Sequence, residues 1–174
     1  VTARYNRIHN NLGTFGTAIF IRDEQTINLD TYEYNTISGS SNTIEGIPDS
    51  SLIYIDSNTN STIQYNNIVI GQETYLIYQN PTSIYGDTTA ENNWWGTTNT
   101  TNLDALIYDW NDNPTKGLVD YTPILTAPNT SAPPAPPSNV ASQTGATSIG
   151  FTWDANIESD IAGYKLYYDT DESG

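Results

Sequence analysis

The chain contains no cysteine and no methionine. Without cysteine no disulfide can stabilise the fold, so packing and hydrogen bonds must do so. Without methionine Val1 is not an initiator residue, and we expect the chain to begin inside a longer polypeptide or after processing. No apolar run approaches the roughly 18 residues that a membrane-spanning helix needs, so we expect no membrane insertion.

Basic side chains are also scarce. Five lysine and arginine residues stand against 20 aspartate and glutamate residues, and the formal net charge is −15. Such a surface repels phosphate, so nucleic acid is not an expected partner. Only 14% of the residues are charged, and the polar surface must therefore consist of Asn, Thr, Ser and Tyr. Because Thr and Tyr favour strands and Asn favours turns, this composition predicts an all-β protein.

The tetrapeptide Tyr-Asn-x-Ile recurs along the first half of the chain. Its copies begin at Tyr5, Tyr34 and Tyr65, and a divergent copy, Glu91-Asn92-Asn93-Trp94, follows. With Asn92 as the fourth equivalent of Asn6, Asn35 and Asn66, the steps are 29, 31 and 26 residues. A period of this size is typical of solenoids, in which each repeat pairs only with its neighbours.

Short apolar runs lie between these copies, at residues 18–21, 52–55 and 75–78. Each repeat therefore holds about three short β segments separated by turns. A single unit cannot bury its apolar face, whereas stacked units can. We expect Ile and Leu to form inward ladders, and the turn Asn of one repeat to hydrogen-bond the Asn of the next. The alternative is an antiparallel sandwich with coincidental Asn turns.

The segment Asn92-Asn93-Trp94-Trp95-Gly96, followed by Gly117-Leu118-Val119-Asp120-Tyr121-Thr122-Pro123, resembles the closing segment of right-handed parallel β-helix repeat proteins. The resemblance covers roughly residues 1–128. It implies that residues 1–127 are the C-terminal rungs and cap of a right-handed parallel β-helix. An open solenoid end needs covering, and we expect a structural cap built from Trp94, Trp95, Trp110 and Tyr121. Residues 104–110 have helical spacing and predict one short helix within the cap.

Proline dominates residues 128–137, which predicts a semi-extended linker. The following residues, 138–174, resemble the first three strands of fibronectin type III domains. The resemblance depends on the Pro-Pro entry, on Trp153-Asp154, and on Gly163-Tyr164 leading into Tyr167-Tyr168. Alternation at residues 149–153 and 164–168 predicts two half-buried strands. Such a sandwich needs two complete sheets, so we expect an incomplete domain, completed either by further residues or by a neighbouring copy.

Candidate catalytic groups are few, and we predict no catalytic residue in this chain. His9, with Arg7 and Arg22, could form a basic spot on adjacent turns, and Asp23 with Glu24 is a carboxylate pair in a turn. The default interpretation of both is a solvated surface. Hydrolysis would need two spaced carboxylates, and no strand repeats such a pair from one turn to the next.

Two binding hypotheses remain, and each rests on side-chain chemistry alone. Asp109, Asn111 and Asp112 are oxygen-rich and could hold a structural Ca²⁺, although the segment lacks the glycine and glutamate of an EF-hand loop. Otherwise we expect no cofactor. A flat row of aromatic rings could bind a glycan, and its candidate members are Trp95, Tyr32, Tyr54 and Tyr78.

These observations favour a non-catalytic structural or adhesive segment of a modular prokaryotic protein that is secreted or held at the cell surface. The expected partners are polysaccharides, cell-surface components or further copies of the chain assembled into fibres. One alternative is the non-catalytic C-terminal part of a polysaccharide lyase or glycosidase, and another is a glycan-binding module.

Overall fold

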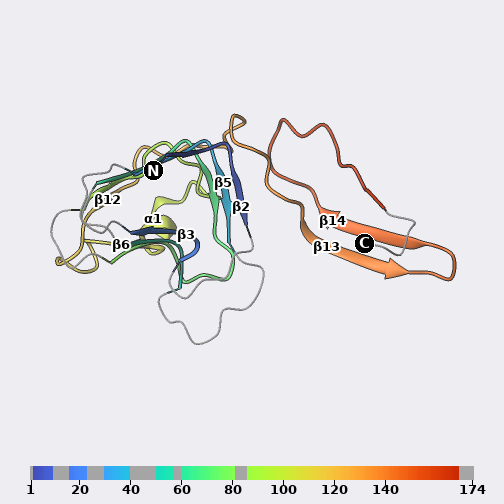
Figure 1. The fold of residues 1–174 in the computed structure, drawn as a ribbon, viewed down its shortest axis with the longest axis horizontal. Helices are drawn as coiled ribbons and strands as arrows, with labels where there is room; N and C mark the ends of the chain where they lie inside the picture. The colour runs from blue at the N-terminus through green and yellow to red at the C-terminus, as the bar shows by residue number, and fades with distance from the viewer. Residues whose placement is uncertain are drawn as a thin grey trace.

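The computed structural model describes residues 2–9, 16–22, 30–39, 50–56, 60–80 and 86–168, apart from the side chains of residues 9, 16, 17 and 22. The described chain is all-β, and most of its strands pair in parallel (Figure 1). The prediction of an all-β chain is thus confirmed. Among the described residues the single helix is a short one, α1 (Thr100–Asp104).

Three parallel sheets contain the strands that the structure describes before residue 121. The first sheet has the order β1 (Thr2–Arg4), β4 (Asp30–Glu33), β7 (Ser61–Gln64), β10 (Thr88–Thr89) and β12 (Val119–Asp120). The second has the order β2 (Arg7–His9), β5 (Thr36–Ser38) and β8 (Asn67–Val69). The third has the order β11 (Ile107–Tyr108), β9 (Tyr75–Gln79), β6 (Ser51–Asp56) and β3 (Gly16–Arg22).

The chain enters these sheets in rotation, so that β1, β2 and β3 are followed by β4, β5 and β6. Each circuit, which we call a turn, pairs strand by strand with the turn before it. The result is a coil in which neighbours in space are about 30 residues apart in sequence, as the 29-residue offset of Thr2 and Thr31 illustrates.

The core lies between the three sheets and is built mainly from isoleucine, several of them paired with an isoleucine in the next turn. Ile53 pairs with Ile77, and Ile77 pairs with Ile107 in the next turn. Ile37 stacks on Ile68 in the second sheet, and both are fully buried. Each buried Ile contributes roughly 1.5–3 kcal/mol from the hydrophobic effect, and its β-branched side chain suits the pleated surface. The predicted inward ladders are present.

The coil closes at its far end through residues 92–125. Trp95 is only 2% exposed and Trp94 is 9% exposed, while the N–H of Asn92 donates to the carbonyl of Pro123 at 2.6 Å. Tyr121 packs half-buried against the core. Trp110 differs from the other predicted cap residues, because 51% of its surface is exposed.

The prediction of a helix over residues 104–110 is wrong. The helix begins after Asn99, which caps its N-terminus by accepting from the N–H groups of Thr101 and Asn102, and it ends at Asp104 with Ala105 as its C-cap. Ile107 and Tyr108 instead form strand β11, which extends the third sheet. The apolar residues that suggested helical spacing are core residues of a strand.

Residues 128–137 lie against the coil at several points. The carbonyl of Pro133 accepts a hydrogen bond from the Oγ1 of Thr36, and Ala132 is buried. The N–H of Asn129 donates to the Oδ1 of Asn67 at 2.7 Å, and the Nδ2 of Asn67 donates back to the carbonyl of Asn129 at 3.1 Å. This segment is therefore held along the second sheet, where a semi-extended spacer was predicted.

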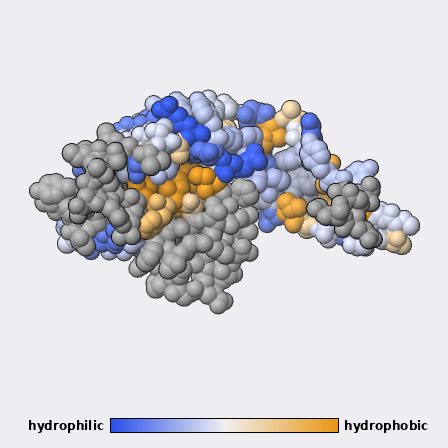
Figure 2. Space-filling view, in the orientation of Figure 1, coloured by the Kyte–Doolittle hydropathy of each residue, from blue (hydrophilic) through white to orange (hydrophobic). Residues whose placement is uncertain are grey.

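The C-terminal unit begins with the antiparallel pair β13 (Ser138–Thr144) and β14 (Ile149–Asp154). Both strands are exposed along their whole length, so the prediction that 149–153 is half-buried is wrong. The strand predicted at residues 164–168 is also absent, since no neighbouring backbone pairs with it in the described chain. Figure 2 shows that hydrophobic atoms reach the surface of this face over the coil and over the C-terminal unit.

Candidate functional site

One corner of the coil, between the first and second sheets, is held by a ladder of asparagine side chains. The backbone N–H and Nδ2 of Asn6 both donate to Oδ1 of Asn35, at 2.9 and 3.0 Å. Asn35 makes the same two bonds to Asn66, at 2.8 and 3.0 Å. Asn66 makes them to Asn93, again at 2.8 and 3.0 Å. We call these four residues the Asn ladder.

The fourth member is Asn93, and the prediction of Asn92 is wrong by one residue. Trp94 bridges to Asn67, so Trp95 takes the buried place that Ile68 holds one turn earlier. Aligning Asn92-Asn93-Trp94-Trp95 with Tyr-Asn-x-Ile would have found this register, since an apolar residue then falls at the core position.

The residue before each ladder Asn has left-handed backbone. Tyr5, Tyr34 and Tyr65 have φ of 57°, 55° and 59°, and Asn92 continues the series at 58°. The three tyrosine rings are stacked, with centroids 5.4 and 5.3 Å apart and interplanar angles of 15° and 10°. Positive φ is uncommon for a bulky residue and easier for Asn. In three turns the residue with this left-handed conformation is a stacked Tyr, and in the fourth turn it is Asn92.

A second aromatic row follows the third sheet. The rings of Phe20, Tyr54, Tyr78 and Tyr108 stack in sequence, with centroid separations of 5.5, 5.4 and 4.6 Å. Tyr75 leans against both Tyr78 and Tyr108. Within this row each interior ring has both faces against its neighbours.

This arrangement bears on the residues named for glycan binding. A sugar stacks on the exposed face of a ring, but Trp95 is buried, and Tyr54 is 8% exposed with both faces stacked. Tyr78 lies in the same row. Tyr32 is half-buried in β4, where burial and the nearby Asp30 carboxylate raise the pKa of its hydroxyl. The structure brings Tyr54 and Tyr78 together and leaves Trp95 and Tyr32 apart from them.

The oxygen-rich segment 109–113 forms a compact turn. The Oδ1 of Asp109 accepts from the N–H of Asn111 at 2.8 Å, and its Oδ2 accepts from the N–H of Val119 at 2.9 Å. Asp112 turns inward, because its Oδ2 accepts from the N–H of Asp109 at 3.1 Å. Burial raises the pKa of Asp109, although these two backbone hydrogen bonds pull it down.

Both oxygens of Asp109 are therefore occupied by backbone donors, and this carboxylate connects the turn to β12. No group of three or more His, Cys, Asp or Glu side chains suited to a metal ion occurs within the described ranges. The carboxylate pair Asp23 and Glu24, considered above as catalytic candidates, lies outside the described residues. The side chains of His9 and Arg22, from the predicted basic spot, also lie outside them.

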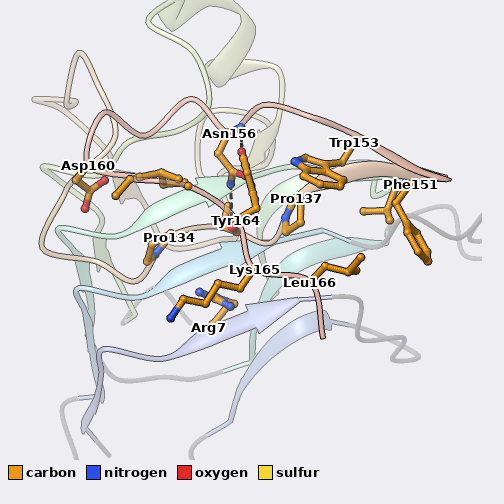
Figure 3. A pocket seen from close by; sticks show the side chains of 15 residues that line it. Arg7, Pro134, Pro137, Phe151, Trp153, Asn156, Asp160, Tyr164, Lys165 and Leu166 are labelled. Carbon is orange, nitrogen blue, oxygen red and sulfur yellow. Dashed lines mark hydrogen bonds between the residues drawn. The ribbon is translucent and has the colours of Figure 1, made fainter. Parts of the chain in front are cut away.

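An aromatic-lined cleft lies between β2 and the C-terminal unit, with a volume of about 530 Å³. Figure 3 shows Phe151 and Trp153 from β14 on its wall, together with Tyr164. The rings of Trp153 and Tyr164 meet edge to face at 5.2 Å. Arg7, one of the predicted basic residues, lines the cleft from the coil.

Comparison of the chain with protein-family models, with curated proteins and with solved structures gives no match. Within the described part of the chain, no helix has the length and apolarity needed to cross a membrane.

Sequence reasoning missed Asn129, which joins the linker to the coil through its backbone and through its Nδ2, a donor to the carbonyl of Tyr65. It also missed Glu158, whose Oε1 accepts from the N–H of Ala135 at 2.7 Å. Neither residue repeats along the chain, so no periodic signal could have revealed its role.

Proposed function

We propose that this chain is a non-catalytic structural or adhesive segment of a secreted or cell-surface modular protein. In this proposal residues 1–127 are the last turns and the cap of a right-handed parallel β-helix. Residues 138–174 begin a fibronectin type III-like sandwich, and residues 128–137 join the two. Parallel pairing of successive turns supports the first assignment.

The observation that carries the proposal is that Asn and aromatic side chains at equivalent positions of successive turns bind one another. At one corner of every turn an Asn hydrogen-bonds the next Asn, and the preceding Tyr rings stack on one another. On the third sheet a second row of rings does the same. These polar and aromatic groups are engaged in joining one turn to the next, which is the requirement of a rigid rod.

The C-terminal unit supports the second assignment. Ile149, Phe151 and Trp153 alternate along β14 and keep 61%, 40% and 37% of their surface exposed. An apolar face of this kind, opposite the segment that contains Tyr164 and Leu166, matches the inner face of a sandwich whose second sheet is not formed.

The test of a non-catalytic role is a turnover assay. The full chain is incubated with a panel of neutral and acidic polysaccharides, and released reducing ends and unsaturated products are measured. We expect no release above the buffer control. Cleavage that is abolished by a single substitution within residues 1–127, with the fold retained, would overturn the proposal.

A rod also has a mechanical signature. When the coil is stretched from its two ends, we expect stepwise unfolding in units of one turn, about 30 residues or roughly 100 Å of contour length. Smooth extension without force peaks would contradict a structural role.

A second candidate function is glycan binding in the cleft shown in Figure 3, favoured by the partly exposed rings of Trp153 and Tyr164. Titration of soluble oligosaccharides, followed by tryptophan fluorescence, tests it. Binding by the wild-type chain should disappear in Trp153→Ala and persist in Trp110→Ala, which alters an exposed tryptophan outside the cleft. Equal behaviour of the two variants would refute this candidate.

A further inference from the structure

A cavity of about 590 Å³ lies between the outer face of the second sheet and the segment that crosses it. Three of its lining residues, Thr36, Asn67 and Trp94, stand at equivalent positions of successive turns. The opposite wall is formed by parts of residues 135–140 and 155–158. The cavity is therefore separate from the Ile-rich core, and the junction between the coil and the C-terminal unit builds it. We call it the junction cavity.

Hydrogen bonds hold several wall residues of the junction cavity in place. Asn67 exchanges two hydrogen bonds with Asn129. On the other side the Nδ2 of Asn156 donates to the carbonyl of Ala135 at 2.8 Å, and the Oε1 of Glu158 accepts from the N–H of the same residue at 2.7 Å. Walls fixed in this way favour binding, because less conformational entropy is lost when a ligand enters.

Two polar atoms of the lining residues remain without a partner. The Nε1 of Trp94 and the Oε2 of Glu158 are buried and have no hydrogen-bond partner among the described residues. The two residues are only 9% and 8% exposed. A buried donor or acceptor without a partner is costly, above all when it is charged. The junction cavity thus combines one unused donor with one unused carboxylate oxygen.

This pair of groups selects the chemistry of a ligand. A hydroxyl group can donate to the carboxylate of Glu158 and can also accept from the indole N–H of Trp94. An ammonium ion has no acceptor for the indole N–H, and an anion is repelled by the carboxylate. The two unused groups together therefore favour a neutral molecule that carries several hydroxyl groups.

The remaining lining favours a ring with apolar faces. Apolar side chains make up much of it, among them Val69, Pro136, Pro137 and Ile157. A sugar ring presents C–H groups on its faces and hydroxyl groups around its rim, so it matches both parts of this lining. The volume of the junction cavity lies within the range of small-molecule sites.

We propose that the junction cavity binds a neutral saccharide of one or two rings. The Oε2 of Glu158 accepts from a sugar hydroxyl, and the Nε1 of Trp94 donates to a sugar oxygen. The inference rests on the adhesive role proposed above and deepens it by naming a ligand class. The site differs from the cleft in Figure 3, because neither Trp153 nor Tyr164 of that cleft lines the junction cavity.

Nuclear magnetic resonance of the ¹⁵N-labelled full chain tests the proposal. Maltose, cellobiose and lactose are titrated separately, and the indole N–H signal of Trp94 is identified by its loss in Trp94→Phe. We expect this signal to shift saturably with at least one disaccharide, while the signal of the exposed Trp110 stays in place. Sorbitol, an open-chain polyol without a ring face, should bind at least tenfold more weakly. Equal affinity for sorbitol, or no saturable shift with any disaccharide, overturns the inference.

Two conservative variants test the assigned groups by calorimetry. Glu158→Gln retains an oxygen for the N–H of Ala135 and replaces the second oxygen by an amide nitrogen, and Trp94→Phe retains an aromatic ring without the N–H. Each should weaken disaccharide binding about tenfold or more, with the backbone spectrum otherwise unchanged. Trp153→Ala is the matched control in the neighbouring cleft and should bind like the parent chain. Parent-like affinity in both conservative variants would contradict the assignment.

Choline chloride supplies an arm for the cationic alternative. Saturable choline binding that is lost in Glu158→Gln and kept in Trp94→Phe, without disaccharide binding, would show a cation site and overturn the inference. Turnover and stepwise unfolding are measured separately from saccharide binding. Failure of this inference can therefore be distinguished from failure of the proposed function.

Discussion

At the scale of single residues, Asn66 within the Asn ladder uses both the oxygen and the nitrogen of its amide side chain. The Oδ1 of Asn66 accepts twice from Asn35, and its Nδ2 donates to the carbonyls of Tyr32 and Gln64 and to Asn93. Asn66 is fully buried. Such a residue cannot be truncated without leaving several buried polar groups unpaired.

We therefore expect Asn66→Ala to lower the free energy of unfolding by about 3–5 kcal/mol, since each buried orphan costs roughly 1–3 kcal/mol. Urea denaturation followed by circular dichroism measures this. Asn60→Ala, at an exposed position, is the control and should change little. Similar losses in the two variants would show that the ladder contributes no special stability.

Asp109 leads to a prediction about pH. Burial raises its pKa in the folded chain above the ordinary value, so the folded state takes up the proton more readily than the unfolded state. The stability that this carboxyl contributes is present at low pH and declines as the pH rises through its folded-state pKa.

Accordingly, the unfolding free energy of the wild-type chain minus that of Asp109→Asn should increase as the pH falls from about 7 to about 4. Subtracting the variant removes the common effect of the other carboxylates. Parallel urea titrations at several pH values provide the measurement. A difference that is flat or shrinks toward acid would mean that the hydrogen bonds from Asn111 and Val119 outweigh burial.

At the scale of elements, the coil is built from strands of only two to seven residues, each with a partner in a neighbouring turn. Strands this short are marginal alone and depend on stacking. The segment after the cap uses the same device, because Asn129 exchanges two hydrogen bonds with Asn67 at the edge of β8.

Replacing Asn129 by Ala keeps its backbone bonds but removes both the Nδ2 donor to the Tyr65 carbonyl and the Oδ1 acceptor of the Ser131 N–H. We expect residues 128–137 to detach more often, with amide exchange at Ser131 and Ala132 accelerated several-fold, and with a loss of about 1 kcal/mol in coil stability. Thr130→Ala, which alters an exposed neighbour, should leave both quantities unchanged. Exchange rates that match in the two variants would contradict this role for Asn129.

At the scale of the whole molecule, charge is the dominant imbalance. A formal charge of −15 destabilises the compact state through self-repulsion. Arg4 and Glu33 form a close ion pair at 2.7 Å, with the arginine half exposed. Exposed pairs of this kind contribute only about 0–1 kcal/mol, so salt should relieve more repulsion than it removes attraction.

The thermal midpoint should therefore rise by a few degrees as NaCl increases from about 20 to about 200 mM, because the Debye length falls to less than 10 Å. Differential scanning calorimetry measures the shift, and choline chloride at the same ionic strength should reproduce it. A midpoint that falls with salt would indicate that attractive pairs dominate.

The sequence by itself determined the all-β character, the spacing of about 30 residues between neighbouring turns, and the Ile-rich core, because strand propensity and apolar periodicity are local properties. Tertiary structure decided which of Asn92 and Asn93 joins the ladder. Asn92 can adopt the left-handed backbone that Tyr adopts in the earlier turns, so it takes the position before the ladder and Asn93 becomes the ladder member. It also decided that Tyr54 and Tyr78, two of the rings named for binding, lie face to face, and that Ile107 belongs to a strand.

The same holds for Asn129 and for residues 164–168. Asn129 binds Asn67 of β8, which is 62 residues away in sequence. Residues 164–168 could form a strand only with a partner backbone beside them. The local sequence pattern indicates which secondary structure a segment can adopt, whereas pairing with residues distant in sequence decides which one it adopts.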